Sequence, residues 1–455
     1  MLLCRVRLGQ ALCDVRVRGT RITEVGGSLR PRGGEEVYDG GGGALLPGLY
    51  DHHIHLLALA ARASSIDCGP PRVTRVEELA VVLAEAAEAS PPGGWLRGTG
   101  YAESVAGLPD RHLLDRLVPD HPVRMEHRGG ALWLLNSAAL AEVAPVLDHS
   151  PDVERDASGE PTGRLWRYDS RLRRALPPSS PDLAAVGARL GSYGITGMTD
   201  ATPDLGPGAL RLLRAAAADG SLPQSVHLMG APGSDVPVKI HVRDHDLPSL
   251  DALVADVSAA HGAGRAVAVH CVTRESLLLT LVALRVAGPR SGDRIEHASV
   301  VPPEARDLLA DCGAQVVTQP TLLTGRGDDY LRDVDPQDAD LLYPYASLLA
   351  HGIPVAASSD APYGDPDPWA SVRAAHTRRT PSGRVLNPDE RVSTRTALHG
   401  FLTSAHDPGG RARRVLPGHR ADLCLLSVPF EEALADPRAE HVALTLCGGR
   451  IVHRR

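Results

Sequence analysis

Short apolar runs rich in β-branched residues alternate with stretches rich in alanine and leucine over most of this 455-residue chain. Runs of the first kind are typical of buried strands, and the other stretches are typical of helices that connect parallel strands. Eight such repeats predict an α/β fold of the (β/α)8 TIM-like barrel type, whose active sites lie at the C-terminal ends of the strands. The candidate strands are Ala44 to His55, Ile195 to Ala201, Val226 to Gly230, Val238 to Val242, Ala266 to Val272, Arg294 to Ser299, Gln315 to Pro320 and Val355 to Ala361.

Both ends of the chain read differently from the middle. Alternating segments separated by glycine-rich turns predict short antiparallel strands at Cys4 to Leu8, Asp14 to Arg18, Arg21 to Val25, Asp422 to Leu426, Val442 to Leu446 and Arg450 to Arg454. We therefore expect residues 1–46 and 409–455 to form one composite β-sandwich beside a barrel of residues 47–408. The segment 62–190 separates the first two barrel strands, and we interpret it as an inserted lid subdomain.

Charge and composition exclude several classes of partner. The formal net charge is −7 and the isoelectric point is about 6.3, so we expect neither nucleic acid nor an anionic membrane as a partner. No apolar run reaches membrane-spanning length. The seven cysteines form no CxxC pair, which favours reduced thiols. We expect a cytoplasmic protein that acts on a small molecule, with a homo-oligomer left open.

All but one of the 48 lysine and arginine residues are arginine, and the exception is Lys239. A guanidinium stays protonated, whereas a desolvated ε-amine can lose its proton and be modified. Lys239 lies within the predicted strand 238–242 rather than in a polar surface segment. A chance surviving lysine is the alternative, but the surrounding β-branched run favours a buried position with a chemical role.

Metal-ligand residue types follow several predicted strands. His53 and His55 stand two apart, so both imidazoles leave one face of an extended chain. His270, His297 and Asp360 come at the C-terminal ends of three later strands, and we expect them at the same barrel mouth. Each alone is compatible with a core polar group. Together with Lys239, they predict a metal site.

This set of residues resembles the signature of the amidohydrolase superfamily of metal-dependent hydrolases. The resemblance covers essentially the whole chain. Several shorter segments resemble the amidohydrolase-3 branch, which includes N-substituted formamide deformylases: Leu135 to Leu140, Tyr193 to Gly197, Ser359 to Pro362 and Leu416 to Leu423.

The resemblance implies a binuclear centre and a reaction. A carbamate formed from CO2 on Lys239, together with a hydroxide, would bridge two divalent metal ions, zinc or alternatively manganese or iron. His53, His55 and Asp360 would hold one metal, and His270 and His297 the other. Asp360 would move a proton from the nucleophile to the leaving nitrogen. The implied activity is hydrolysis of a non-peptide C–N bond of amide, N-formyl or N-acyl type.

Some positions depart from the residues usual in the branch, and we expect them to shape the substrate pocket. They are Arg128 to Ala131, Arg167, Arg243 with Asp244, and Thr273 with Arg274. His241 shares the face of Lys239 and is a candidate for substrate contact. Arg128, Tyr101 and Tyr363 are further candidates, each with packing or surface exposure as the alternative.

Three other functions are compatible with parts of this pattern. A cyclic-amide hydrolase of the dihydroorotase or hydantoinase type shares all six ligands. A mononuclear deaminase typically has glutamate three residues after the histidine of the fifth barrel strand, which is His270 in this chain. Thr273 stands at that position here. A structural relative that lost its metals is the non-enzymatic alternative, and the presence of all six ligand types disfavours it.

Overall fold

A computed structural model describes residues 1–176, 181–203 and 205–455. The chain divides into two compact units, one made of Met1–Leu57 with Leu183–Arg455 and the other of Ala58–Asp182. The predicted insert 62–190 ends within helix α7 (Leu183–Ser192), and this helix belongs to the first unit. Within the described residues, none of the helices combines the length and apolar character that crossing a bilayer requires.

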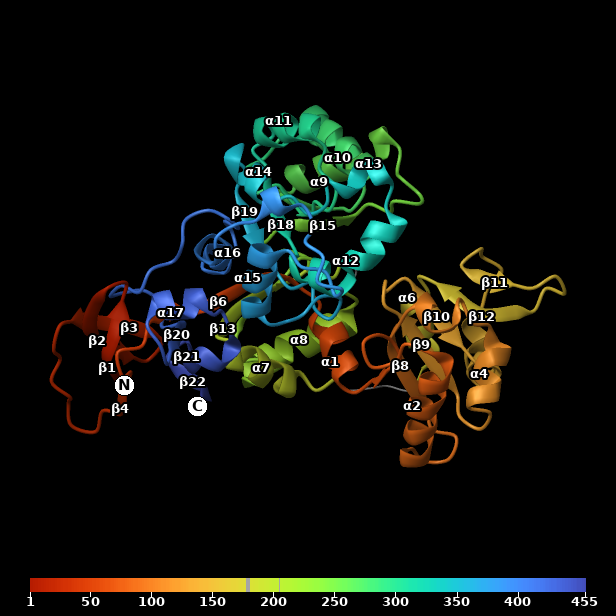
Figure 1. The fold of residues 1–455 in the computed structure, drawn as a ribbon, viewed down its shortest axis with the longest axis horizontal. Coiled ribbons are helices and arrows are strands. Elements are labelled where there is room, and N and C mark those ends of the chain that lie inside the picture. Colours follow the sequence, from red (N-terminus) through yellow and green to blue (C-terminus); the bar gives the residue numbers. More distant parts are fainter. Residues whose placement is uncertain (177–180, 204) are drawn as a thin grey trace. The chain divides into compact units, whose positions relative to one another are not determined.

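Parallel strands form the centre of the first unit (Figure 1). Three pair in the order β14-β13-β6 and five in the order β15-β16-β17-β18-β19. Their bounds are β6 (Leu49–Ile54), β13 (Ile195–Asp200), β14 (Ser225–Leu228), β15 (Val238–His241), β16 (Val267–Cys271), β17 (Arg294–His297), β18 (Gln315–Thr318) and β19 (Val355–Ala357). All eight predicted segments thus contain a parallel strand. Among the described residues, the pairing does not close into one ring.

Helices follow these strands, as the alternating pattern predicts. The helices between successive parallel strands include α8 (Pro207–Asp219), α9 (Leu250–Gly262), α10 (Arg274–Ala287), α11 (Pro303–Asp311), α12 (Thr321–Asp333), α13 (Pro336–Ala339) and α14 (Ala346–Ala350), and α15 (Pro368–Thr377) and α16 (Thr394–Phe401) come after the last. Because the strands are parallel, the ends that carry the predicted ligands lie along one edge of each sheet.

The first predicted strand is wrong as one continuous element. Residues Ala44 to His55 form β5 (Leu45–Pro47) and β6, which belong to different sheets. Gly48 separates them, and a side chain there would meet Thr196 Cγ2 at 2.1 Å. The backbone of residue 48 can lie this close to Thr196 of β13 only because glycine has no Cβ. The chain passes from one sheet to the other at this glycine.

Two four-stranded sheets come from the chain ends. The first has the order β3-β2-β1-β4 and the second β22-β21-β20-β5. Their bounds are β1 (Leu2–Leu8), β2 (Ala11–Arg18), β3 (Arg21–Gly26), β4 (Val37–Asp39), β20 (Leu423–Leu426), β21 (Val442–Cys447) and β22 (Arg450–Arg454), and α17 (Phe430–Ala435) follows β20. Buried side chains from both sheets, among them Val15 and Leu446, share one hydrophobic cluster. The six predicted terminal strands are confirmed.

The second unit contains a six-stranded mixed sheet in the order β11-β12-β10-β9-β8-β7. Its strands are β7 (Ile66–Asp67), β8 (Leu96–Tyr101), β9 (Val123–His127), β10 (Leu132–Leu135), β11 (Val153–Arg155) and β12 (Pro161–Trp166), with α2 (Val76–Ala89), α3 (Glu103–Ala106), α4 (Arg111–Leu117), α5 (Ser137–Val143) and α6 (Asp169–Ala175). Helix α1 (Leu56–Ala63) leads into this unit. Two hydrophobic clusters pack its helices and strands together.

Candidate metal centre

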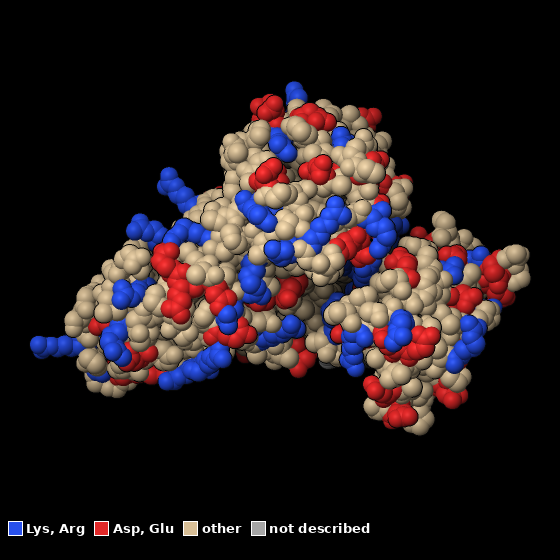
Figure 2. All heavy atoms as spheres, viewed as in Figure 1, with Lys and Arg blue, Asp and Glu red and all other residues tan. Residues whose placement is uncertain are grey.

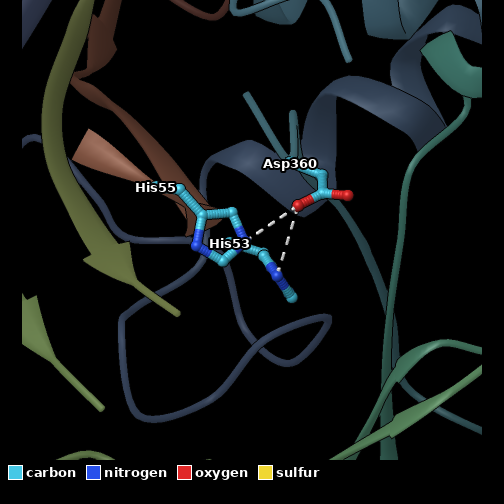
Figure 3. A group of neighbouring side chains, drawn as sticks. All are labelled: His53, His55 and Asp360. Atoms are coloured by element: carbon cyan, nitrogen blue, oxygen red, sulfur yellow. Dashed lines mark ion pairs between the residues drawn. The ribbon is translucent and has the colours of Figure 1, made fainter. Parts of the chain in front are cut away.

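His53, His55 and Asp360 point toward one another (Figure 3). His53 lies on β6, His55 directly follows that strand, and Asp360 follows β19. Asp360 Oδ1 is 3.2 Å from His55 Nε2 and 3.5 Å from His53 Nε2. Two imidazole nitrogens and a carboxylate oxygen at this spacing are a ligand set for a divalent cation.

A buried chain of charged groups orients His53. Its Nδ1 hydrogen bonds to Glu296 Oε2, and Arg294 Nε donates to the other oxygen of that carboxylate. The side chains of His53, Glu296 and Arg294 are at most 1% exposed. A carboxylate that accepts from Nδ1 fixes the proton there and leaves the Nε2 lone pair toward Asp360. Carboxylates that accept from the far nitrogen of a metal-ligating histidine give this arrangement.

His297 has the same tautomer for a different reason. Gln319 Nε2 donates to Ser358 Oγ at 3.0 Å, so its Oε1 faces His297 and accepts from Nδ1 at 2.7 Å. His55 Nδ1 lies 3.0 Å from Thr202 Oγ1. In all three imidazoles the Nδ1 atom has a polar partner, which leaves Nε2 for a ligand.

Ring contacts extend the cluster to a fourth predicted ligand. The His297 ring lies 4.9 Å from that of His53 and 4.4 Å from that of His270, measured between centroids. His241 is exposed at the end of β15 and stacks on His270 at 4.6 Å. The structure therefore brings both predicted histidine pairs together, with His241 at their solvent side.

Lys239 is buried on β15, and its Nζ has no hydrogen-bond partner. Burial lowers the pKa of this amine, and the nearby carboxylates Glu296 and Asp360 only partly oppose that effect. An unpaired buried ammonium is costly, so the site favours either a neutral amine or a modified one. An orphaned amine beside a ligand cluster fits a group whose missing partners would be metal ions.

Backbone hydrogen bonds fix Asp360 relative to β6. Asp360 N donates to His53 O at 2.8 Å, and the buried carboxylate of Asp51 accepts from the backbone N–H groups of both His53 and Ser359. Burial raises the pKa of Asp51 to about 6. Asp360 and His297 have φ values of +53° and +71°, a region that costs free energy for residues with a side chain. The packing around them therefore holds both ligands in conformations that they would not adopt freely.

Burial and mutual repulsion keep the imidazoles neutral. Burial lowers the pKa values of His53, His270 and His297 well below their ordinary value, and neighbouring imidazoles and Lys239 lower them further. Burial alone would raise the pKa of Asp360, but the adjacent His55 and His53 lower it overall. Neutral imidazoles and an ionised carboxylate are the forms that bind a metal.

The remaining candidates for substrate contact lie in different places. Tyr363 is at the centre, since its ring lies 5.6 Å from that of His55 and its N–H donates to Asp360 O. Tyr101 is fully buried in the core of the second unit and donates its hydroxyl proton to Gly107 O. Arg128, which follows β9, also belongs to that unit.

Two positions that depart from the branch pattern, Asp244 after β15 and Thr273 after β16, bond to each other. Thr273 caps α10, and its hydroxyl donates to Asp244 Oδ1 at 2.8 Å. Arg274 forms an ion pair with Asp338. In the other unit, Arg167 N donates to Ala131 O at 2.7 Å. The Thr273–Asp244 hydrogen bond connects the loop after β15 to the start of α10.

Glu296 and Arg294 contact the candidate site, and the sequence prediction did not include them. Both lie on β17, two positions apart and directly before His297. The sequence did contain a signal: charged residues stand at alternate positions of a strand that is otherwise predicted to be buried. Buried charges need partners inside the fold, so such a pattern indicates an internal ion pair.

Comparison with known proteins agrees with this geometry. The model of the amidohydrolase family matches residues 36–453. The N-substituted formamide deformylase of Arthrobacter pascens is 27% identical, covering 97% of this chain and 95% of that protein. Crystal structures of uncharacterized metal-dependent hydrolases from Pyrococcus horikoshii OT3 and Pyrococcus furiosus have TM-scores of 0.70 and 0.69, at 20% and 22% identity. Each alignment covers 94% of this chain, and it covers 97% of the P. horikoshii chain and 98% of the P. furiosus chain. Both proteins therefore share the fold of this chain.

Proposed function

Because this chain belongs to the amidohydrolase family, we propose that it hydrolyses a non-peptide C–N bond of amide, N-formyl or N-acyl type with the help of two divalent metal ions. The observation that carries the proposal is the buried, unpartnered Nζ of Lys239 beside the His53, His55 and Asp360 cluster. The 27% identity to a formamide deformylase over nearly the whole chain supports the choice of bond.

The donor set is compatible with two cations. His53, His55 and Asp360 would hold the first, and His270 and His297 the second. A carbamate on Lys239 would supply one oxygen to each, which no arginine can do because only an amine forms this adduct. Zinc suits imidazole and carboxylate ligands, with manganese and iron as alternatives. When bound, such cations make hydroxide available at neutral pH and polarise the scissile carbonyl.

The chain's own residues then have distinct tasks. Glu296 keeps the proton of His53 on Nδ1, and Gln319 does the same for His297. Asp360 is ionised at neutral pH, so it can accept the proton of the attacking nucleophile and give it to the leaving nitrogen. An amine is a poor leaving group until it is protonated, so the C–N bond needs this transfer to break. His241 and Tyr363, which flank the histidines, would contact the substrate.

The same proposal includes the finer architecture. The two parallel sheets together would form a (β/α)8 barrel, and the sheets from the chain ends would form a β-sandwich. A lid role for the inserted unit, a cytoplasmic location and self-association stay predictions.

On the face drawn in Figure 2, acidic and basic side chains are interspersed.

A cyclic-amide hydrolase would use the same ligands, so the substrate has to separate the two activities. Deamination is disfavoured because Thr273, at the position of the expected glutamate, caps α10 and bonds to Asp244.

The test is a substrate screen with zinc-loaded and manganese-loaded protein. N-formyl amines, N-acyl amines, carbamoyl compounds and cyclic imides are incubated with the protein, and the released amine and carboxylic acid are quantified. Turnover of an open-chain amide that stops when metal is removed is the expected result. Turnover of cyclic imides alone would overturn the bond assignment, and turnover unaffected by metal removal would overturn the mechanism.

A further inference from the structure

A second group of metal-ligand side chains lies away from the cluster described above. His227 Nδ1 is 3.0 Å from Asp235 Oδ1, and His406 Nε2 is 3.7 Å from Asp235 Oδ2. The two imidazole rings lie 5.4 Å apart and nearly perpendicular. One ligand atom from each residue lies within 4.8 Å of the others. Two imidazoles thus converge on one carboxylate, as they do in the His53, His55 and Asp360 cluster.

The distances match those within a coordination sphere. Zinc binds imidazole nitrogen and carboxylate oxygen at about 2.0–2.2 Å, so neighbouring ligand atoms of a tetrahedral ion are roughly 3.3–3.5 Å apart. The two separations, 3.0 Å to Asp235 Oδ1 and 3.7 Å to Asp235 Oδ2, lie on either side of this value. Small rotations of the exposed Asp235 and His406 side chains would bring both imidazole nitrogens within ligand spacing of one Asp235 oxygen. A direct His227–Asp235 hydrogen bond fits the same geometry once a cation replaces the proton.

His227 lies on β14, whereas Asp235 and His406 lie near the N-terminal edge of the five-stranded sheet, away from the catalytic candidates. Asp235 precedes β15, and it lines a cavity of about 260 Å³ with His406. The cavity also includes Ala266, Arg294 and Gln315, which stand at the N-terminal starts of β16, β17 and β18. His53, His270, His297 and Asp360 lie near the C-terminal ends of their strands. A cation held here would therefore be separate from those that we propose for catalysis.

The loops that carry the ligands are held in place. Arg265 donates to the carbonyl oxygens of Val236 and Pro237, directly after Asp235. On the other side, Gln315 Nε2 donates to Asp407 Oδ1 at 2.8 Å, directly after His406. These bonds reduce the entropy that the ligands would lose on binding, which makes a weakly buried site more favourable.

We propose that His227, Asp235 and His406 bind one additional divalent transition-metal ion, of which zinc is the type best suited to this donor set. Water from the cavity would complete its coordination. The ion would connect β14 and the loop that follows it to the loop after α16, two segments far apart in the sequence. Two histidines and one carboxylate favour zinc and related ions over magnesium or calcium, which prefer oxygen ligands.

Zinc content of the full chain tests the site. The parent and an Asp235→Asn/His406→Ala double variant are equilibrated at the same free zinc concentration and separated from unbound metal. Zinc per chain is then measured by mass spectrometry, and affinity by competition with a chromophoric chelator. We expect the variant to bind one zinc fewer than the parent, and a separate His227→Ala variant to show the same loss.

His112→Ala is the matched control, because His112 faces Asp115 at 3.9 Å on α4 and is similarly exposed. It should leave the zinc content unchanged. Equal zinc content in the parent and the double variant would overturn the proposal, as would the same loss in the control. Catalytic metal ions contribute equally to the parent and all three variants, so this result does not depend on the hydrolase assignment.

Discussion

The Nδ1 atom of His53 hydrogen bonds to the buried carboxylate of Glu296, which also accepts from Arg294. Glu296→Gln replaces the charged acceptor by a neutral amide and leaves the Arg294 guanidinium buried without its counter-ion. Removing one member of a buried ion pair costs about 3–5 kcal/mol of the free energy of unfolding. Loss of a ligand-orienting carboxylate weakens metal binding about 10–100-fold. Urea denaturation and metal titration measure the two effects.

Glu431→Gln is the matched control for this variant. Glu431 pairs with Arg395, and both side chains are more than half exposed. An exposed pair contributes only about 0–1 kcal/mol, so metal affinity should not change and stability should change little. Similar effects of the two substitutions would contradict an orienting role for Glu296.

Lys239→Arg keeps the positive charge but cannot form a carbamate, so we expect it to lose both metal and activity. In Lys239→Ala, a short added carboxylic acid should restore part of the activity by supplying the missing oxygens. Native mass spectrometry of the parent should detect the added CO2, which acid removes. Full activity in the arginine variant would rule out a bridging carbamate.

Asp360→Asn removes the group that would move the proton to the leaving nitrogen. General acid–base catalysis raises a reaction rate about 10²–10⁴-fold, so kcat should fall by a factor of about 10² or more. Metal content has to be measured in the same preparation, because Asp360 is also a proposed ligand. A variant that keeps both its metal and an unchanged kcat would exclude Asp360 as the proton carrier.

His52 should make the fold sensitive to acid. Burial lowers its pKa to about 3, whereas the unfolded chain has an ordinary histidine value near 6.5. Between these two values the unfolded state binds the extra proton, so stability falls as pH falls, by up to about 1.4 kcal/mol per pH unit. Above the unfolded pKa near 6.5, His52 is neutral in both states and makes the free energy of unfolding no more dependent on pH.

The variant His52→Gln keeps a donor for Gly400 O, with which His52 Nε2 bonds at 3.1 Å, but it cannot titrate. Urea denaturation from pH 7 to pH 4 should therefore give a shallower loss of stability than in the parent. The exposed His112→Gln is the control and should follow the parent. Parallel curves for parent and His52→Gln would show that His52 is not the sensitive group.

The parallel strands were predictable because each is a short apolar run with flanking helix signals, and the ligand types follow directly at their ends. The division of the first predicted strand into β5 and β6 at Gly48 was not predictable, because it depends on contact with Thr196 of the distant strand β13. The sheet in the second unit was missed because strands such as β8 carry arginine and glycine among few apolar residues.

Long-range pairing also explains what the sequence left out of the candidate site. Glu296 acquires its role only when β17 lies near His53, and His227 meets His406 only through folding. No spacing along the chain encodes such contacts. Tyr101 was a reasonable pocket candidate by residue type, yet its side chain fills the core of its own unit.

Anomalous X-ray diffraction from crystals of the zinc-loaded protein, at the zinc absorption edge, tests the central claim most directly. The account predicts two anomalous peaks among His53, His55, His270, His297 and Asp360, with electron density for a carbamate on Lys239 between them. Absence of any peak beside Asp360 would contradict the metal-dependent mechanism. A single peak with unmodified Lys239 would contradict the two-metal centre.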